Sequence, residues 1–522
     1  MRASMSCERP ERDDKEGKNE RKDMKYNNLK KMPEEALPAI LLGASLCFAA
    51  AMSVTFNPDT DAWWLTATGK ALWERGFVKE NPFCMVKGLS FTAQQTACCL
   101  LNYLAESLFG MKGLWTLAVL FNMVMLASAL VALSAAGAGR YRRLLVLATL
   151  EFAVARSGLV TTRPYQVTMA ITFLALAAWI KWSNGKRGRK ETAKVLAVQT
   201  VLAVLQANFQ SSSLVLLFLW PICFTIPGID DLVLKEIREG NPKKIPKNLI
   251  KGTKTALKTL LPAWIVTAVA SLLNPYGISG AVYLIKSAEA VKTMSRVISE
   301  MEEPTIFSFQ TLLLMLLAAL SVMSARNKGM QWIPYLAAGS AVLAASYNRN
   351  AWILMVAAAV ASGAEGRTEK TEKTEKKNGR AMPRLLAAAG LALGIAMAVF
   401  LSKPVTEPEA VKFVRNAMSE GETVRLMTAF GTGGYFEHAG IPSFVDARLE
   451  LTSNGISGAG IMEEWYAADV QGYDPEGFIQ RYEFNYLATQ PATGYLGYFA
   501  RHSDDWELVA ADEKICLYRK IR

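Results

Sequence analysis

The chain has 522 residues, 51% of them hydrophobic, and its 58 Lys and Arg outnumber its 46 Asp and Glu to give a formal net charge of +12. The basic excess lies in short loops between apolar runs, which is typical of membrane proteins, so we expect no nucleic-acid partner. With only two His residues in the chain, a His-based metal cage and a Ser-His-Asp triad are both disfavoured.

The first two regions of the chain predict a cytoplasmic tail and a helical membrane domain. Residues 1–35 are charged and contain no apolar run, which indicates a basic, disordered tail. The membrane domain is expected at 36–403, with about eleven apolar helices. These predicted spans cover 36–56, 113–136, 144–160, 165–180, 195–208, 214–229, 259–273, 306–324, 332–345, 351–363 and 385–401. Because basic loops stay inside, the N-terminus should be cytoplasmic and the last span should end outside.

Two connecting segments stand out within the membrane domain. The first outer loop is expected at 57–112, and its amphipathic section at 91–109 predicts a helix lying along the membrane surface. Its cysteines, Cys84, Cys98 and Cys99, are equally compatible with one disulfide and with free thiols. The segment 365–384 repeats Thr-Glu-Lys, which indicates a solvated cytoplasmic linker.

Residues 404–522 predict a separate extracytoplasmic α/β domain. A helix is expected at 407–419 and strands at 423–428, 484–489, 506–510 and 515–518, so helices and strands alternate. A further short strand is expected at 443–445, followed by Asp446 and Arg448 as a structural ion pair. The glycines at 431, 433 and 434 lack the full spacing of a dinucleotide fingerprint and are interpreted as a tight turn before a helix.

The strongest chemical signal is a pair of carboxylates at the start of the first outer loop. Asp59 and Asp61 follow the first predicted span directly, and Trp63 and Trp64 next to them fit the aromatic belt of a membrane boundary. A carboxylate there suits a general base toward a hydroxyl, or a ligand of a divalent cation. The alternative is structural, with Asp61 capping the helix that follows.

Polar residues on other predicted outer turns could complete such a site. Arg163 and Arg349 lie between spans, where guanidinium groups suit a phosphate headgroup, although arginines at such positions also snorkel to ordinary lipids. Asn208 and Gln210 lie on a polar turn that could bind a sugar or only satisfy helix ends. Glu300 precedes a span and could face Asp61, or belong to a solvated acidic run.

The order of these motifs resembles bacterial members of the GT-C glycosyltransferase superfamily, over almost the whole chain after the tail. The motifs that carry the resemblance are Asp-x-Asp-x-Trp-Trp at 59–64, Arg163-Pro164, Ala207-Asn208, Leu-Asn-Pro-Tyr-Gly at 273–277, Glu300, Arg349-Asn350 and Asp446-x-Arg448.

The resemblance implies a multi-pass enzyme of the bacterial cytoplasmic membrane that takes a sugar from a polyprenyl-phosphate carrier on the outer face. By that pattern Asp61 is the catalytic residue, with Asp59 second, and Arg163 and Arg349 bind the lipid phosphate. No cofactor is certain, a divalent cation remains compatible, and the oligomeric state is not indicated. The substrate-binding residues expected from the pattern are Trp63, Trp64, Asn208, Gln210, Asn274, Tyr276, Glu300 and Asn350.

Three departures from the pattern keep alternatives open. Leu65 stands where the resembled branch usually has His, Met301 replaces a Trp after Glu300, and Gln210 lies where His is common. These changes favour a non-catalytic scaffold of cell-envelope assembly, whereas the retained acidic and Arg residues favour the transferase. A transporter of lipid-linked sugars ranks last, because the predicted spans carry few charged groups.

Overall fold

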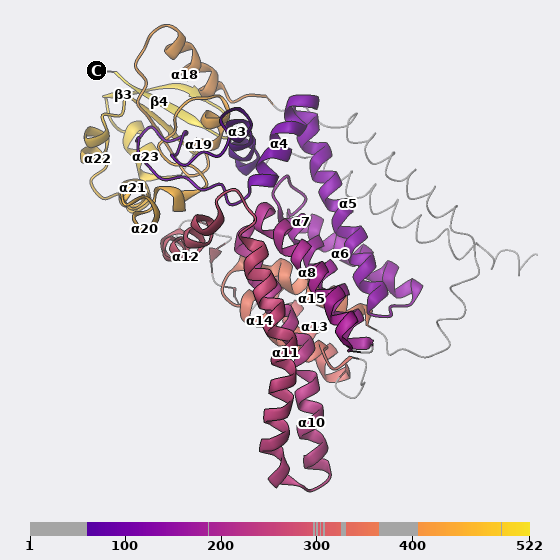
Figure 1. Cartoon of the computed structure of the whole chain (residues 1–522). Coiled ribbons are helices and arrows are strands. Elements are labelled where there is room, and N and C mark those ends of the chain that lie inside the picture. The colour runs from indigo at the N-terminus through magenta and orange to yellow at the C-terminus, as the bar shows by residue number, and fades with distance from the viewer. Residues whose placement is uncertain are drawn as a thin grey trace, which may run out of the picture.

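The computed structural model describes residues 60–185, 187–295, 298, 301–302, 304–305, 308–324, 330–364, 406–491 and 493–521. A helical bundle forms the middle of the molecule, a small sheet with short helices lies at one end, and a two-helix hairpin projects from the other (Figure 1). The tail at 1–35, the predicted spans at 36–56 and 385–401, and the linker at 365–384 lie outside the described residues.

The bundle forms where the sequence carries its apolar runs. Its central helix is α7, which is buried along nearly its whole length and packs against α5. The hairpin is made of α10 (Pro227–Arg238) and α11 (Ile245–Ser271), and α11 continues back into the bundle. Apart from α11, the helices of the bundle are α5 (Met111–Ala135), α6 (Arg140–Arg156), α7 (Tyr165–Asn184), α8 (Arg189–Phe209), α9 (Val215–Thr225), α13 (Phe309–Ser324), α14 (Ile333–Ala344) and α15 (Ala351–Gly363).

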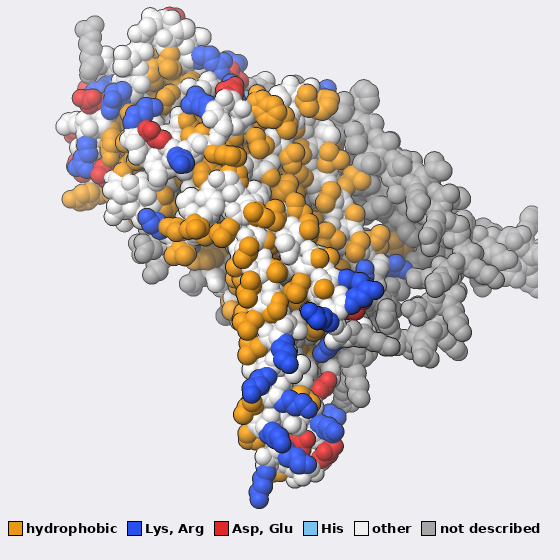
Figure 2. Space-filling view, in the orientation of Figure 1, with side chains coloured by type: hydrophobic (Ala, Val, Ile, Leu, Met, Phe, Trp, Pro, Cys, Tyr) orange, Lys and Arg blue, Asp and Glu red, His pale blue; other side chains and the backbone are white. Residues whose placement is uncertain are grey.

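The surface of the bundle is apolar in the manner of a lipid-facing protein. Hydrophobic side chains spread over its side, whereas Lys and Arg gather on the hairpin (Figure 2). Exposed apolar side chains include Leu120, Val201, Ile265 and Leu312, and such a broad exposed area marks a membrane or partner surface. Among the described residues three segments are long and apolar enough to cross a membrane, namely Met111–Ala135, Arg189–Phe209 and Ser211–Arg238. The full count of about eleven spans stays a prediction.

The first outer loop contains two helices that pack against each other, one after Asp61 and one within the predicted amphipathic section at 91–109. The placement of that section along the membrane surface stays a prediction. α3 (Thr60–Arg75) and α4 (Thr96–Phe109) cross closely at Gly69, where an added Cβ would lie 2.0 Å from the carbonyl oxygen of Cys99. No residue larger than glycine fits at this crossing. Cys84, Cys98 and Cys99 are buried free thiols, so the disulfide alternative is not adopted.

The C-terminal region forms a four-stranded mixed sheet in the order β1-β2-β4-β3. β1 and β2 are parallel, whereas β4 runs antiparallel to both β2 and β3. All four strands fall on predicted strands, and α18 (Glu409–Ser419) falls on the predicted helix. The strands and the other elements are β1 (Leu426–Thr428), β2 (Tyr486–Thr489), β3 (Trp506–Ala511), β4 (Cys516–Lys520), α19 (Gly433–His438), α20 (Asn454–Ser457), α21 (Ile461–Trp465), α22 (Pro475–Tyr482) and α23 (Tyr495–Arg501).

The fifth predicted strand, at 443–445, is wrong in detail. Ser443 forms only an isolated parallel bridge with Cys84 of the first loop. The extended segment therefore pairs with another part of the chain rather than with the sheet. The glycine-rich turn opens a helix as predicted, because α19 begins at Gly433, and an added Cβ there would lie 2.2 Å from the carbonyl oxygen of Val445.

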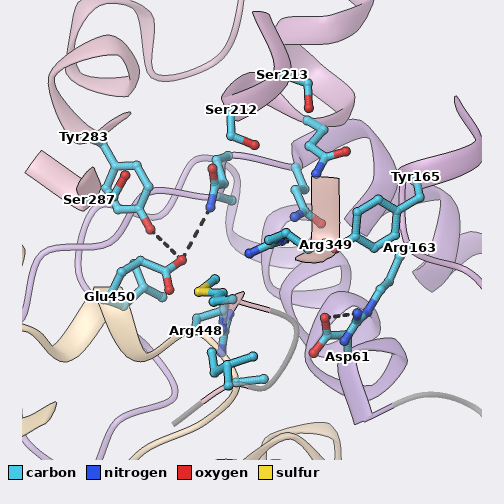
Figure 3. A pocket seen from close by; sticks show the side chains of 18 of the residues that line it. Asp61, Arg163, Tyr165, Ser212, Ser213, Tyr283, Ser287, Arg349, Arg448 and Glu450 are labelled. Atoms are coloured by element: carbon cyan, nitrogen blue, oxygen red, sulfur yellow. Dashed lines mark hydrogen bonds and ion pairs between the residues drawn. The ribbon is translucent and has the colours of Figure 1, made fainter. Parts of the chain in front are cut away.

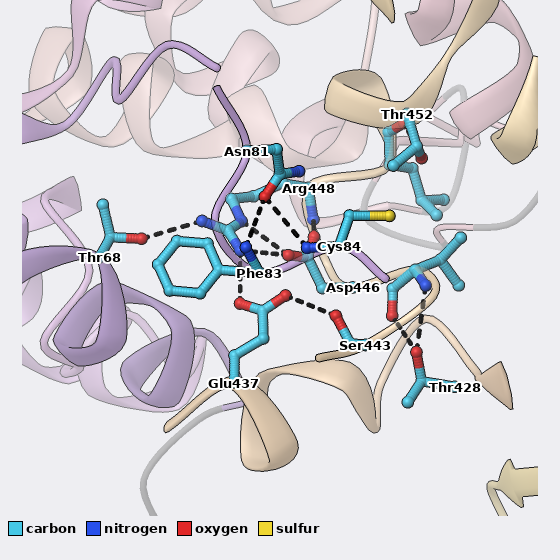
Figure 4. A network of polar contacts seen from close by, with 12 residues as sticks. Thr68, Asn81, Phe83, Cys84, Thr428, Glu437, Ser443, Asp446, Arg448 and Thr452 are labelled. Carbon is cyan, nitrogen blue, oxygen red and sulfur yellow. Dashed lines mark hydrogen bonds and ion pairs between the residues drawn. The ribbon is translucent and has the colours of Figure 1, made fainter. Parts of the chain in front are cut away.

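A buried cluster of charged side chains connects the C-terminal region to α3. Arg448 donates to Asp446 (Nε to Oδ2, 2.9 Å), to Glu437 (Nη2 to Oε2, 2.5 Å) and to Thr68 Oγ1 (2.9 Å), as Figure 4 shows. Burial raises the pKa of Glu437 well above its usual value. For Asp446 burial also acts to raise the pKa, but the charge of Arg448 and the hydrogen bonds from Glu437 and Arg448 together outweigh it, so the pKa is lowered. The predicted pair of Asp446 and Arg448 is confirmed, and it also reaches the first loop.

Asp469 gives this region a pH-dependent stability. Its side chain is 4% exposed and accepts a hydrogen bond from Leu496 N at 3.1 Å, and burial raises its pKa from 3.8 to about 6. Because the folded state favours the protonated form of Asp469, the free energy of unfolding falls by about 3 kcal/mol as pH rises from about 4 to above 6. Asp469→Asn should remove this loss, so the unfolding midpoints of wild type and variant in detergent should diverge over that range. Midpoints that stay parallel from pH 4 to 7 would contradict it.

Candidate active site

A cavity of about 320 Å³ lies where the first loop, the bundle and the C-terminal region meet. α3 and the loop before α4 form one side, and α7, α9, α15 and the segment Asn348–Asn350 form the bundle side. α12 (Gly277–Met294) closes the cavity on one side, and the short helix Leu449–Thr452 closes it from the C-terminal region. Segments far apart in sequence therefore contribute to one site.

One end of the cavity carries two guanidinium groups and a carboxylate. Arg163 Nε lies 2.7 Å from Asp61 Oδ2, and both side chains are less than one-fifth exposed, at 18% and 17%. Arg349 donates to the hydroxyl of Tyr165 at 3.0 Å, and the Arg163 guanidinium lies 5.9 Å from the centre of the Tyr165 ring. Figure 3 shows Tyr165 between the two arginines, with Asp61 beside Arg163. We call this group the arginine end.

Local turns place these side chains. Asp61 is the second residue of α3 and belongs to its first turn, where a carboxylate suits the positive end of a helix. Arg163 precedes Pro164, the N-cap of α7, and its backbone N–H donates to Thr161 Oγ1 at 3.1 Å. Arg349 lies in a 3₁₀ turn at Asn348–Asn350 between α14 and α15. Helix ends thus position all three charged groups.

The opposite end of the cavity carries a buried carboxyl group. Glu450 Oε1 accepts from the hydroxyl of Tyr283 at 3.0 Å and from Gln94 Nε2 at 3.4 Å (Figure 3). Glu450 is 8% exposed and Tyr283 is 5% exposed. Burial raises the pKa of Glu450, and burial together with the nearby Glu450 raises the pKa of Tyr283 well above its usual value. We call this group the carboxyl end.

The structure brings together most of the predicted charged residues. Asp61, Arg163 and Arg349 line the cavity with Gln210 and Asn350, which come from separate turns. Trp64 also lines it, and the Arg448 guanidinium lies 4.8 Å from the centre of a Trp64 ring. Their roles in binding and catalysis stay predictions. Asp59 and Glu300 lie outside the described residues, so the predicted divalent cation also stays a prediction.

Four predicted substrate-binding residues lie away from this cavity. Trp63 packs against Tyr435 and His438 with ring centres 5.1 and 4.9 Å apart, because it lies on the face of α3 that meets α19. Asn208 donates to the carbonyl oxygen of Leu273 at 2.9 Å and so joins two helix ends.

The other two, Asn274 and Tyr276, line a smaller neighbouring cavity of about 30 Å³ instead. The Tyr276 hydroxyl donates to the carbonyl oxygen of Val78 at 3.1 Å. This contact joins the segment after α11 to the first outer loop.

Sequence reasoning missed both members of the carboxyl end that come from late in the chain. Tyr283 lies in an unremarkable helix, and Glu450 follows the recognised Asp446 and Arg448 without a motif of its own. Tyr165 was also missed, although its place directly after Arg163-Pro164 was a usable signal. Only the tertiary structure shows that these three side chains share a cavity.

No protein-family model and no curated protein matches the chain. Among solved structures, it is similar to an oligosaccharyltransferase, AglB from Archaeoglobus fulgidus, in complex with an inhibitory peptide and a dolichol-phosphate, at 11% identity and a TM-score of 0.49 over 86% of this chain and 69% of that one. It is also similar to ArnT from Cupriavidus metallidurans, at 11% identity and a TM-score of 0.43 over 92% and 98% of the two chains.

Proposed function

We propose that the protein is a membrane glycosyltransferase that moves a sugar from a polyprenyl-phosphate carrier to an acceptor on the outer face of a bacterial cytoplasmic membrane. The observation that carries the proposal is the arginine end of the cavity, where Arg163 and Arg349 lie beside the carboxylate of Asp61. Two guanidinium groups suit a phosphate, and a carboxylate suits a general base. The apolar bundle next to the cavity suits a lipid tail.

The proposed reaction uses these groups at the two partners of one transfer. The bond between the anomeric carbon and the phosphate oxygen breaks as the acceptor oxygen bonds to that carbon. Asp61 takes the proton of the acceptor hydroxyl, and Arg163 orients the Asp61 carboxylate through their 2.7 Å contact. Arg349 and Arg163 stabilise the charge that grows on the departing polyprenyl phosphate. The transition state has oxocarbenium character, as in other glycosyl chemistry.

The arrangement in the membrane belongs to the same proposal. With about eleven spans, the hairpin of α10 and α11 would be cytoplasmic and the cavity extracytoplasmic. The gathering of Lys and Arg on that hairpin, at the end of the bundle away from the sheet, supports this orientation (Figure 2).

The departures from the family pattern do not all fall in the site. Leu65 is fully buried in the core and does not line the cavity, so the missing His leaves the cavity lining unchanged. Gln210 and Met301 do line the cavity, and there they replace an imidazole and an indole by an amide and a thioether. We therefore favour the transferase and treat the scaffold as the reading that a negative assay would support.

Arg349→Gln should weaken donor binding, and it should also slow turnover, because Arg349 stabilises the charge that grows on the departing phosphate. A hydrogen bond to a charged group contributes about 1.5–3 kcal/mol, so the KM for the polyprenyl-phosphate donor should rise about 10- to 100-fold. Steady-state transfer at varied donor concentration measures this. Arg142→Gln is the matched control, since Arg142 donates to the carbonyl oxygen of Ala364 away from the cavity. A donor KM that changes equally in both variants would refute a phosphate-binding role.

The experiment that tests the proposed function is a transfer assay. Purified membranes containing the protein are offered a panel of radiolabelled polyprenyl-phosphate sugars, and membranes without it are the control. Consumption of one donor only in the presence of the protein would support the proposal. A folded protein that consumes no donor of a broad panel would favour the scaffold.

A further inference from the structure

We infer that the carboxyl end of the cavity, formed by Glu450, Tyr283 and Gln94, is a binding site for the hydroxyl groups of an uncharged sugar ring. This inference rests on the proposed function and extends it, because it assigns a ligand class to residues outside the family motifs. Such a ring can come from the donor sugar or from a sugar-like acceptor, and the two sources share this chemistry.

The first support is the convergence of three separate segments on one carboxyl group. Gln94 comes from the first loop, Tyr283 from α12, and Glu450 from the helix Leu449–Thr452. Tyr283 and Gln94 both donate to Glu450 Oε1, at 3.0 and 3.4 Å. Among the described residues no side chain donates to Oε2, so this oxygen is available to accept from a ligand hydroxyl in the cavity that Glu450 lines.

The second support is the free-energy cost of burying the carboxyl group of Glu450. A carboxyl group held at 8% exposure by a phenol, an amide and a backbone N–H among the described residues is expensive to bury, since none of these partners carries a compensating charge. The nearby Arg448 is engaged by Asp446 and Glu437 and donates to neither oxygen of Glu450. Carboxylates, amides and phenols that converge in a cavity are the groups that fix the orientation of a polar ligand.

The third support is the polarity of the cavity. Two guanidinium groups lie at the arginine end, whereas at the other end lies the carboxyl group of Glu450, and the nearby Arg448 is engaged by Asp446 and Glu437. A phosphate is therefore attracted most strongly to the arginine end. A neutral ring placed between the two ends would meet further hydroxyls, because Ser212, Ser213 and Ser287 also line the cavity (Figure 3).

A structural reading predicts a different result. The hydrogen bonds of Glu450 also join α12 and the first loop to the C-terminal region, and loss of such a bond alone would lower stability. Glu450→Gln separates the two readings, since the amide oxygen can still accept from Tyr283 and Gln94 while the charge is lost. Stability should then change little.

The test measures transfer by wild type, Glu450→Gln and Tyr283→Phe, with donor and acceptor concentrations varied separately. Glu450→Gln should raise the KM of one substrate about tenfold or more, and Tyr283→Phe should raise the KM of the same substrate by less. The substrate affected identifies the source of the ring. Glu476→Gln, an exposed carboxylate of the same region, is the matched control and should change neither KM. Unfolding midpoints of all variants are measured alongside.

The outcomes separate the two proposals. If wild type transfers sugar and the folded Glu450→Gln variant keeps both KM values within twofold of wild type, the inference is wrong and the proposed function stands. If Glu450→Gln does not fold, Tyr283→Phe decides in the same way. A wild-type protein that transfers no sugar overturns the proposed function and this inference together.

Discussion

Asp61→Asn should reduce the turnover of sugar transfer by about 10²- to 10⁴-fold, the range over which a positioned general base acts. The variant keeps the volume of the side chain and an oxygen that can accept from Arg163, so the 2.7 Å contact has a neutral counterpart. Donor binding should therefore change little, and the loss should fall on kcat. Such a split is expected of a group whose role appears in the transition state.

The control for this experiment lies on the same helix. Glu74 is exposed near the end of α3, and Glu74→Gln should transfer sugar at the wild-type rate. Rates are measured in single turnover with saturating donor, so that product release does not mask the chemical step. Full activity in the Asp61→Asn variant would remove Asp61 from the mechanism and return it to the structural role of a first-turn carboxylate.

Arg448→Met should lower the free energy of unfolding by about 3–5 kcal/mol, because it leaves buried carboxyl groups without their cation. Asp446 and Glu437 are 7% and 4% exposed, and Arg448 is the cation that pairs with both. The Met side chain fills most of the space that the Arg448 side chain occupies. The loss in the free energy of unfolding therefore comes from the unpaired carboxylate charge rather than from a cavity. Because the raised pKa of Glu437 favours its neutral form, the cost should come mainly from Asp446.

A surface ion pair provides the comparison for this variant. Arg519 and Glu507 pair across β4 and β3 with side chains 39% and 43% exposed. Arg519→Met should cost at most about 1 kcal/mol, as exposed pairs do. Unfolding of both variants is followed in the same detergent. Equal losses for Arg448→Met and Arg519→Met would show that the buried cluster does not fasten the C-terminal region to α3.

Most helices and strands could be predicted because their signals are local. Apolar runs between basic loops predicted α5 to α9 and α13 to α15 close to their bounds, and alternating apolar residues predicted the four strands at 426–520. The stretch 230–258, expected as a loop between two spans, is instead mostly helical, because α10 and the first half of α11 lie there. The strand expected at 443–445 failed because Ser443 pairs with Cys84, a contact between residues remote in sequence. No local pattern encodes such a pairing.

The candidate site could be predicted in part for the same reason. Asp61, Arg163 and Arg349 each lie at the end of a helix, where a charged residue beside an apolar run is conspicuous in sequence. Glu450 and Tyr283 carry no such signal, since one follows an ion pair and the other lies within a helix. Their common cavity arises from packing of the C-terminal region on α12.

Photolabelling can show whether the arginine end of the cavity holds the phosphate of a polyprenyl carrier. A polyprenyl phosphate with a photoreactive group on its first isoprene is cross-linked to the protein in membranes, and the labelled peptides are sequenced. We expect saturable labelling of segments beside Arg163 and Arg349, competed by unlabelled polyprenyl phosphate and lost in the double variant Arg163→Gln, Arg349→Gln. Saturable labelling elsewhere on the bundle, or labelling that this variant leaves unchanged, would contradict it.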